Sequence, residues 1–142
     1  MSGSQGSILK SEDSGKTWIN VCPNIYQDFD FRGIAVLAKN TIIAMSAGEA
    51  TEGKAFLLKS SDGGKTWEKL FYINQTTGCS DLVMDPKNPN VMYASFWEFR
   101  RTAYSFNSGG ESSALYKTTD GGKTWNKIHN GFPSGKLGRI AI

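Results

Sequence analysis

An octapeptide that occurs three times constrains the fold of this chain more than any other sequence feature. The copies occupy residues 11–18, 60–67 and 118–125, and Asp, Gly, Lys, Thr and Trp stand at the same five positions in each. A short apolar alternating run precedes and follows every copy, which is the pattern of two strands joined by a hairpin turn. Glycine supplies the positive φ of such a turn, and the Asp and Thr oxygens can accept hydrogen bonds from its unpaired N–H groups. We therefore expect hairpins in which the tryptophan is buried at the start of the second strand. The residues expected to have this structural role are Asp13, Gly15, Thr17, Trp18, Asp62, Gly64, Thr66, Trp67, Asp120, Gly122, Thr124 and Trp125.

The spacing of the octapeptides predicts units of four strands. Their aspartates lie 49 and then 58 residues apart, and 19 residues after each one a polar residue opens an apolar run. These opening residues are Arg32, Asp81 and Arg139. Second strands are visible at residues 41–47 and 91–96, so each octapeptide joins the third strand of a unit to the fourth. Because strand direction alternates, the octapeptides are expected at one end of the units, and the opening residues at the other end with residues 99–112.

Tandem four-stranded units indicate an all-β fold, a partial β-propeller of four-stranded antiparallel blades. We expect residues 1–7 to be a leader or tag-like segment, 8–24 a partial blade with its third and fourth strands, 25–73 and 74–131 two full blades, and 132–142 the first strand of a further blade. A ring typically needs about four to eight blades. The expectation is therefore a fragment, a subunit of an assembled ring, or a designed or recombined repeat protein. Unpaired edges and apolar faces on the end blades predict self-association.

Charge and cysteine content exclude several classes of function. The 16 basic and 13 acidic residues give a net charge of +3 without any run of five basic residues, so a nucleic-acid partner is not expected. The apolar stretches are far shorter than the about 20 residues that cross a bilayer, so membrane insertion is not expected. Cys22 and Cys79 belong to no metal-binding pattern, and two half-buried thiols are favoured over a disulfide. No metal or cofactor is predicted.

The octapeptide is similar to the Asp box, or BNR repeat, of sialidases, xyloglucanase-type hydrolases, sortilin-type receptors and photosystem II assembly-factor-like propellers. Residues 85–94, 99–101 and 108–110 resemble sortilin-type and BNR glycosyl hydrolase-like proteins, whereas residues 31–36 and 44–48 resemble the assembly-factor type. These families are often secreted or extracytoplasmic. Since the Asp box occurs in proteins of unrelated activity, the resemblance implies the fold and leaves the function open.

Residues 97–106 are the strongest candidate for a binding site, because they contain four aromatic residues and two arginines. Trp97, Arg100 and Arg101 are predicted to bind a carbohydrate or a peptide. The alternative is that the aromatic residues cover the blade edge and pack on the next blade. Arg32 is a further candidate, because residues 31–34 are similar to the sialidase segment Phe-Arg-Ile-Pro, whose arginine binds a carboxylate, although Gly33 and Ile34 depart from it. A salt bridge or a solvated side chain at the strand opening is the simpler interpretation of Arg32.

No catalytic residue is predicted. Glycoside hydrolysis needs two positioned carboxyl groups, or a tyrosine nucleophile paired with a glutamate in sialidases. Asp28 and Asp30 are close in sequence but are interpreted as a solvated turn. We therefore expect a non-catalytic binding or scaffold module. The alternative is a fragment of a sialidase- or xyloglucanase-like hydrolase whose catalytic residues lie outside this chain.

Overall fold

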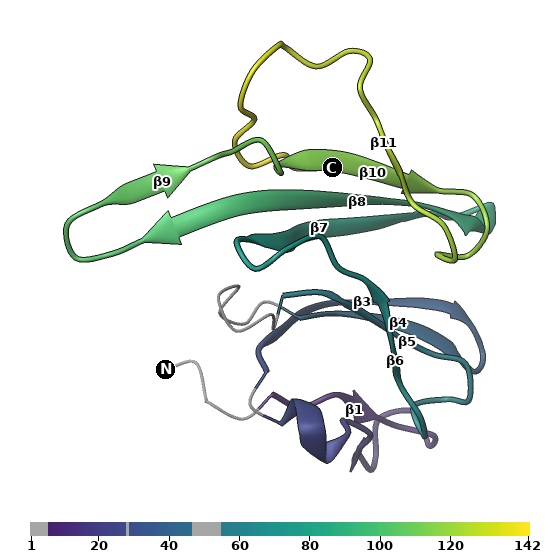
Figure 1. Ribbon diagram of the computed structural model, residues 1–142. Coiled ribbons are helices and arrows are strands. Elements are labelled where there is room, and N and C mark those ends of the chain that lie inside the picture. The colour runs from purple at the N-terminus through teal and green to yellow at the C-terminus, as the bar shows by residue number, and fades with distance from the viewer. Residues whose placement is uncertain (1–5, 28, 47–54) are drawn as a thin grey trace.

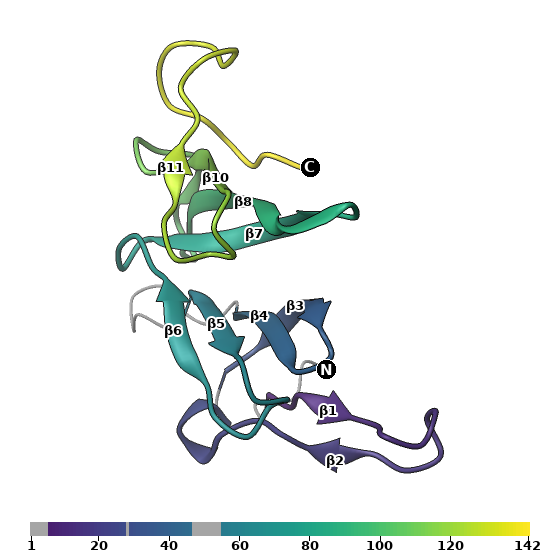
Figure 2. The same cartoon turned by 90° about the vertical axis from the view of Figure 1, so that its right-hand side faces the viewer.

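The computed structural model describes residues 6–27, 29–46 and 55–142, and its strands form three successive antiparallel sheets (Figures 1 and 2). The sheets follow one another in chain order, each stacked face to face on the next (Figure 2). The expected all-β architecture is thereby confirmed.

The first sheet has two strands and lies at the N-terminal end of the stack. Its strands are β1 (Leu9–Lys10) and β2 (Ile19–Asn20), with Leu9 opposite Asn20. A single 3₁₀ turn, η1 (Asn24–Tyr26), leads to the second sheet. Among the described residues this is the one helical segment. No helix there is long and apolar enough to cross a membrane.

The second sheet has four strands in chain order. These strands are β3 (Phe31–Ala38), β4 (Thr41–Ser46), β5 (Leu57–Ser60) and β6 (Glu68–Phe71). In β4 successive side chains are buried, because both faces of the sheet are covered. Ala44 packs toward the first sheet with Phe56 and Leu58, whereas Ile43 and Met45 pack toward the third. This sheet lies within residues 25–73, for which the sequence predicts a full blade.

The third sheet is built in the same order but carries an additional hairpin. Its strands are β7 (Thr77–Asp85), β8 (Asn88–Arg101), β10 (Ala114–Thr118) and β11 (Asn126–Lys127), with β9 (Phe106–Ser108) paired to the end of β8. The sequence predicts a second strand of six residues, yet β8 has 14. Of the additional residues, 99–101 continue beyond β7 and β10 and pair with β9, so that β8 and β9 form a projecting hairpin (Figure 1).

Aromatic packing joins the second sheet to the third. The ring of Phe71 lies 5.1 Å from that of Phe96 and 5.1 Å from that of Tyr116, both edge to face. Edge-to-face pairs at this distance contribute about 0.5–1.5 kcal/mol beyond the apolar area that they bury. Met92, Ala94 and Phe96, alternate residues of β8, are fully buried in this layer.

Residues 132–142 differ from the expected strand. Leu137 forms an isolated bridge with Gly110, and the residues after it belong to no strand. Gly138 lies beside Ser108 at the end of β9, but within the described chain no strand forms a ladder with this segment, and a strand needs a paired neighbour. The second strand expected at residues 41–47 ends at Ser46, and Ala47 is outside the described residues.

The two cysteines are free thiols in separate cores, as the sequence favours, but both are buried and not half-buried. Cys22 packs between the first and second sheets and Cys79 between the second and third. Burial raises the pKa of the Cys79 thiol to about 12. It is therefore uncharged at neutral pH.

Candidate functional site

Each Asp box is closed by a hydrogen-bond network centred on its aspartate. In the second box, Asp62 Oδ1 accepts from the N–H groups of Lys65 at 3.0 Å and Thr66 at 2.9 Å, and Thr66 Oγ1 donates to Asp62 Oδ2 at 2.6 Å. These bonds hold the pKa of the Asp62 carboxyl well below its ordinary value, the bond from the Thr66 hydroxyl being the largest cause. The other boxes repeat the Asp–Thr bonds, and the pKa of Asp13 is lowered to about 2.

Two details of these turns differ from the sequence expectation. The threonine hydroxyl donates to the aspartate carboxylate, and none of the hydrogen bonds found among the described residues runs from a backbone N–H group to it. That backbone role belongs to the first residue of the box, because Ser60 Oγ accepts from Gly64 N at 2.8 Å and Thr118 Oγ1 from Gly122 N at 3.0 Å. The expected positive φ is present, at 94° in Gly64 and 91° in Gly122.

Each of the second and third boxes packs on the last strand of the preceding sheet. Trp67 Nε1 donates to the carbonyl of Val21 at 2.8 Å, and a Cβ on Gly64 would lie 2.9 Å from the Val21 side chain. In the third box Trp125 stacks on Phe71 with ring centroids 5.3 Å apart. The box therefore connects neighbouring sheets, in addition to closing its own hairpin.

Trp18 contradicts the expectation that every box tryptophan is buried. Its side chain is 59% exposed, and its indole N–H donates only within the box, to the carbonyl of Gly15 at 3.1 Å. The physical reason is the packing partner, because no sheet precedes the first one among the described residues.

The β8–β9 hairpin lies at the opposite end of the third sheet from the Asp box. Gly121 of the box donates to the carbonyl of Asn90, near the start of β8, whereas the hairpin is formed by the end of β8. Arg101 pairs with Phe106, and the turn is closed by a 2.8 Å bond from Thr102 N to the carbonyl of Ser105. The hairpin thus has a defined turn that holds its two strands in register.

Strand alternation divides the hairpin into two faces. Side chains two residues apart on a strand share a face, and so do directly paired residues. Trp97, Phe99, Arg101 and Phe106 therefore lie on one face, which we call the aromatic face. Trp97 and Phe99 have ring centroids 4.4 Å apart, and Phe99 and Phe106 5.7 Å. Arg100 lies on the opposite face, so it does not join Trp97 and Arg101 as the sequence analysis expected.

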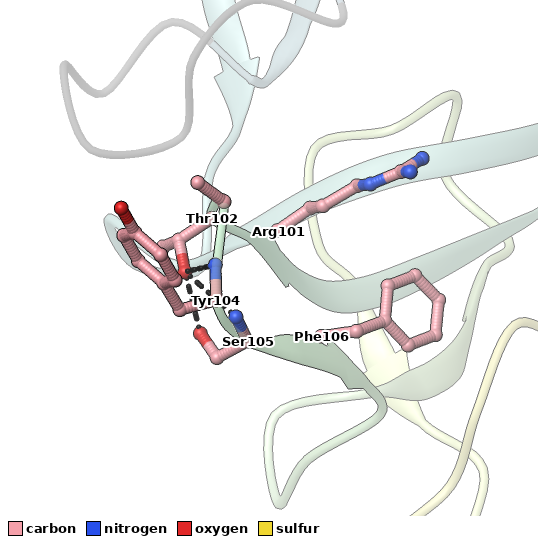
Figure 3. Close-up of a pocket in the computed structure, with 6 residues that line it drawn as sticks. Arg101, Thr102, Tyr104, Ser105 and Phe106 are labelled. Atoms are coloured by element: carbon pink, nitrogen blue, oxygen red, sulfur yellow. Dashed lines mark hydrogen bonds between the residues drawn. The ribbon is translucent and has the colours of Figure 1, made fainter.

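The tip of the hairpin is exposed and hollowed. Phe106 is 65% exposed and Tyr104 is 100% exposed. Figure 3 shows that Arg101 and Phe106 extend toward the same side of the hairpin, while the Tyr104 ring lies beyond the turn. A hollow of about 410 Å³ is lined by Arg101, Thr102, Ala103, Tyr104, Ser105 and Phe106.

The C-terminal segment is held against the root of the hairpin. Gly110 donates to the carbonyl of Leu137 at 3.1 Å, and Ile142 N donates to Asp81 Oδ2 at 3.2 Å. Between these contacts, the guanidinium carbon of Arg139 lies 6.0 Å from the centroid of the Trp97 ring. Sequence spacing placed Arg139 at this end of the sheets but gave no signal of its contact with Trp97, which depends on the Gly110–Leu137 bridge.

Arg32 lies apart from the hairpin. Its Nε donates to Asp30 Oδ2 at 2.8 Å in an exposed ion pair, the simpler interpretation of this residue. It lines a different hollow of about 390 Å³ between β1 and β3, with Ile8, Leu9 and Ile34 among its neighbours. Asp28 is outside the described residues. Within the described part of the chain, no group of three or more His, Cys, Asp or Glu could hold a metal ion.

Comparison with known proteins identifies the family. Residues 6–136 match the model of the Sortilin-Vps10 family, described as sortilin, neurotensin receptor 3. The chain belongs to this family. Photosystem II assembly lipoprotein Ycf48 of Nostoc sp. strain PCC 7120 is 28% identical over 145 residues, which cover 86% of this chain and 42% of that protein.

A solved structure is similar in fold. The GH74 xyloglucanase from Xanthomonas campestris matches 96% of this chain with a TM-score of 0.64 and 17% identity, over 21% of its own length. Each of the resemblances expected from the Asp boxes, to sortilin-type, assembly-factor and xyloglucanase-type proteins, is thereby confirmed. The chain spans less than half of the Nostoc protein and about a fifth of the xyloglucanase.

Proposed function

We propose that this chain is a non-catalytic segment of a sortilin-like propeller and that the aromatic face of its β8–β9 hairpin binds a polypeptide ligand. The observation that carries the proposal is the projection of this face beyond the sheet, with Phe106 and Tyr104 mostly exposed at its tip. Exposed aromatic residues beside an arginine are the residue types that dominate the energy of protein interfaces.

The carboxyl groups of the hairpin support binding over catalysis. Glu98 is the one carboxylate in residues 97–110. It lies on the face opposite to Trp97, and its Oε2 accepts from Ser112 N at 3.2 Å. Hydrolysis of a glycoside needs a proton donor and a second carboxylate on the two sides of the sugar. The alternative of a hydrolase fragment rests on likeness in fold alone.

Ring geometry supports a peptide ligand over a carbohydrate. A sugar stacks on an aromatic ring whose face is flat and open, whereas Trp97 is half-buried and covered by Phe99 at 4.4 Å. Phe99 and Phe106 meet at 82°, so these rings do not form one flat surface on which a sugar ring could lie. The family description, which includes a neurotensin receptor, agrees with a polypeptide ligand.

The proposal is tested by selecting peptides from a random phage-displayed library on the immobilised chain. The peptides recovered are then measured against a Tyr104→Ser/Phe106→Ser double variant, whose substituted side chains are largely exposed, so that folding is retained. Ile25→Ser is the matched control, because Ile25 is also exposed but lies in η1, on the far side of the stack.

We expect the selected peptides to bind the wild-type chain and Ile25→Ser equally, and to lose most of their affinity for the double variant. Failure to enrich any peptide, or equal binding to the double variant, would contradict the proposal. Xyloglucan and sialoside oligosaccharides serve as a second set of probes. Binding of these sugars that depends on Phe106, or their hydrolysis, would replace the peptide proposal with a carbohydrate one.

A further inference from the structure

We infer that the peptide ligand is acidic and extended, and that its carboxylates pair with Arg101 and Arg139 at the two ends of the aromatic face. This inference rests on the proposed function and specifies the chemistry of its ligand. It follows from the positions of the two arginines, from the positions of nearby carboxylates, and from a free strand edge on the hairpin.

Arg101 is an exposed cation at the outer end of the aromatic face. It lies directly opposite Phe106 and lines the hollow at the tip. The ion pairs found among the described residues join Lys10 to Glu12 and Arg32 to Asp30, and neither pair includes a residue of this hairpin. A ligand carboxylate could therefore bind Arg101 in the two-pronged geometry that a guanidinium favours, without displacing a carboxylate of the described chain.

Arg139 provides a second cation at the inner end. Its guanidinium carbon lies over the Trp97 ring, at 6.0 Å, and its segment is held by the Leu137 bridge on one side and the Asp81–Ile142 bond on the other. Its side chain is exposed and makes no ion pair with any described residue. An arginine stacked on an aromatic ring keeps its N–H donors free at the ring edge for an anion.

The nearby carboxylates leave this positive charge unbalanced. Residues 99–110 contain no acidic residue. Glu98 lies on the opposite face, and neither the Asp81 carboxylate nor that of any other described residue lies within ion-pair distance of Arg101 or Arg139. The aromatic face thus combines apolar surface with two cations, which is complementary to a chain of alternating acidic and apolar side chains.

Backbone geometry favours an extended ligand. β9 pairs with β8 on one edge, and its other edge is contacted by Leu137 and Gly138 at residues 108–110 but pairs with no described strand at Phe106. Such an edge can accept a peptide as a further strand, with alternate side chains on the same face. Residues 97 and 101 are separated by about 13 Å along β8, at about 3.3 Å per residue. Carboxylates about four residues apart in an extended peptide would match this separation.

The inference is tested with three fluorescein-labelled decapeptides of alternating Leu and Glu, Leu and Gln, or Leu and Lys. Their affinities are measured by fluorescence anisotropy for the wild-type chain, Arg101→Gln and Arg139→Gln. Arg100→Gln is the matched control on the opposite face, and Arg32→Gln removes an arginine away from the hairpin. The double variant Tyr104→Ser/Phe106→Ser reports whether binding uses the hairpin at all.

We expect the Glu peptide to bind at least about tenfold more tightly than the Gln peptide, and the Lys peptide to bind most weakly. Arg101→Gln and Arg139→Gln should each weaken the Glu peptide about fivefold and leave the Gln peptide unchanged, whereas the two control variants should have no effect. If the Glu and Gln peptides bind equally and both need Phe106, the acidic specificity is wrong and the proposed function stands. If no peptide needs Phe106, both are wrong.

Discussion

At the scale of single residues, one position of the repeat has two different environments. Trp67 is half-buried and donates to the carbonyl of Val21, the residue directly after the last strand of the preceding sheet. Trp18 occupies the same position in the first box but is largely exposed and bonds only within its own turn. The difference separates the contribution of packing between sheets from that of the turn itself.

Trp67→Ala is expected to lower the free energy of unfolding by about 3 kcal/mol, because it removes a large side chain from the core between the first two sheets and leaves the Val21 carbonyl unpaired. Trp18→Ala is the matched control and should change it by less than about 0.5 kcal/mol in dilute solution, since the side chain is already in water. Urea denaturation measures both. Equal losses would contradict a role for the box tryptophan in joining sheets.

The Asp-box carboxylates predict a specific dependence of stability on pH. Hydrogen bonds keep the pKa of Asp62 below its ordinary value in the folded chain, so its stabilising contribution is complete above the unfolded pKa of about 3.9. The contribution is lost as the pH falls below that value toward the folded pKa. Asp62→Asn should therefore destabilise the chain at pH 7 and show a smaller loss of stability between pH 5 and pH 2 than the wild type. Denaturation at several pH values would contradict this if both proteins lost stability equally.

At the scale of elements, the box glycines provide the close approach between sheets. Gly122 and Gly131 have nearly the same φ, 91° and 89°. A Cβ on Gly122 would lie 2.8 Å from Leu70 Cδ2 in β6, whereas one on Gly131 would meet nothing within 4 Å. An alanine would therefore have the same backbone strain at both positions, but it would meet a packing clash only at Gly122.

Gly131→Ala is expected to cost about 1–2 kcal/mol, the strain of a left-handed alanine. Gly122→Ala should cost at least about 1 kcal/mol more, because Leu70 must also move. The comparison is made by thermal or urea denaturation of the two variants. A smaller loss for Gly122→Ala than for Gly131→Ala would show that contact between the box and the preceding sheet is not tight.

Sequence periodicity predicted the regular elements better than the hairpin. The spacing of the boxes was sufficient for the order of β3–β6 and for the pairing across each box, because turn chemistry and strand alternation are local properties. The full length of β8 does not follow from periodicity, since residues 99–101 are exposed on both faces of the strand and show no alternation of apolar and polar side chains. The sequence pattern alone therefore does not separate Arg100 from Arg101, which the strand places on opposite faces.

At the scale of the whole molecule, the described residues leave both end faces of the stack uncovered. Trp18 and Leu9 are exposed on the outer face of the first sheet. Val21 and Leu70 each lie three residues after a box tryptophan, and each contacts the glycine of the next box. Ile128 lies three residues after Trp125 and is therefore the equivalent residue of the third sheet. A further box could therefore pack on the third sheet, and a further last strand could cover Trp18.

The self-association expected from the sequence remains a prediction, and these two end faces are where we expect the chains to contact one another. We expect the average mass in sedimentation experiments to rise with concentration, and Trp18→Ser to reduce the rise by making one of the two faces polar. Tyr104→Ser is the control for association through the hairpin. A constant monomer mass at all concentrations would contradict the prediction.

The central claim is that the ligand binds the aromatic face of the β8–β9 hairpin, and hydrogen exchange tests it most directly. Backbone amide exchange is compared for the chain alone and with the tightest peptide from the phage selection. The account predicts slower exchange in residues 99–108, with residues 60–67 and 118–125 of the Asp boxes unchanged. Protection at the boxes, with none in the hairpin, would contradict it.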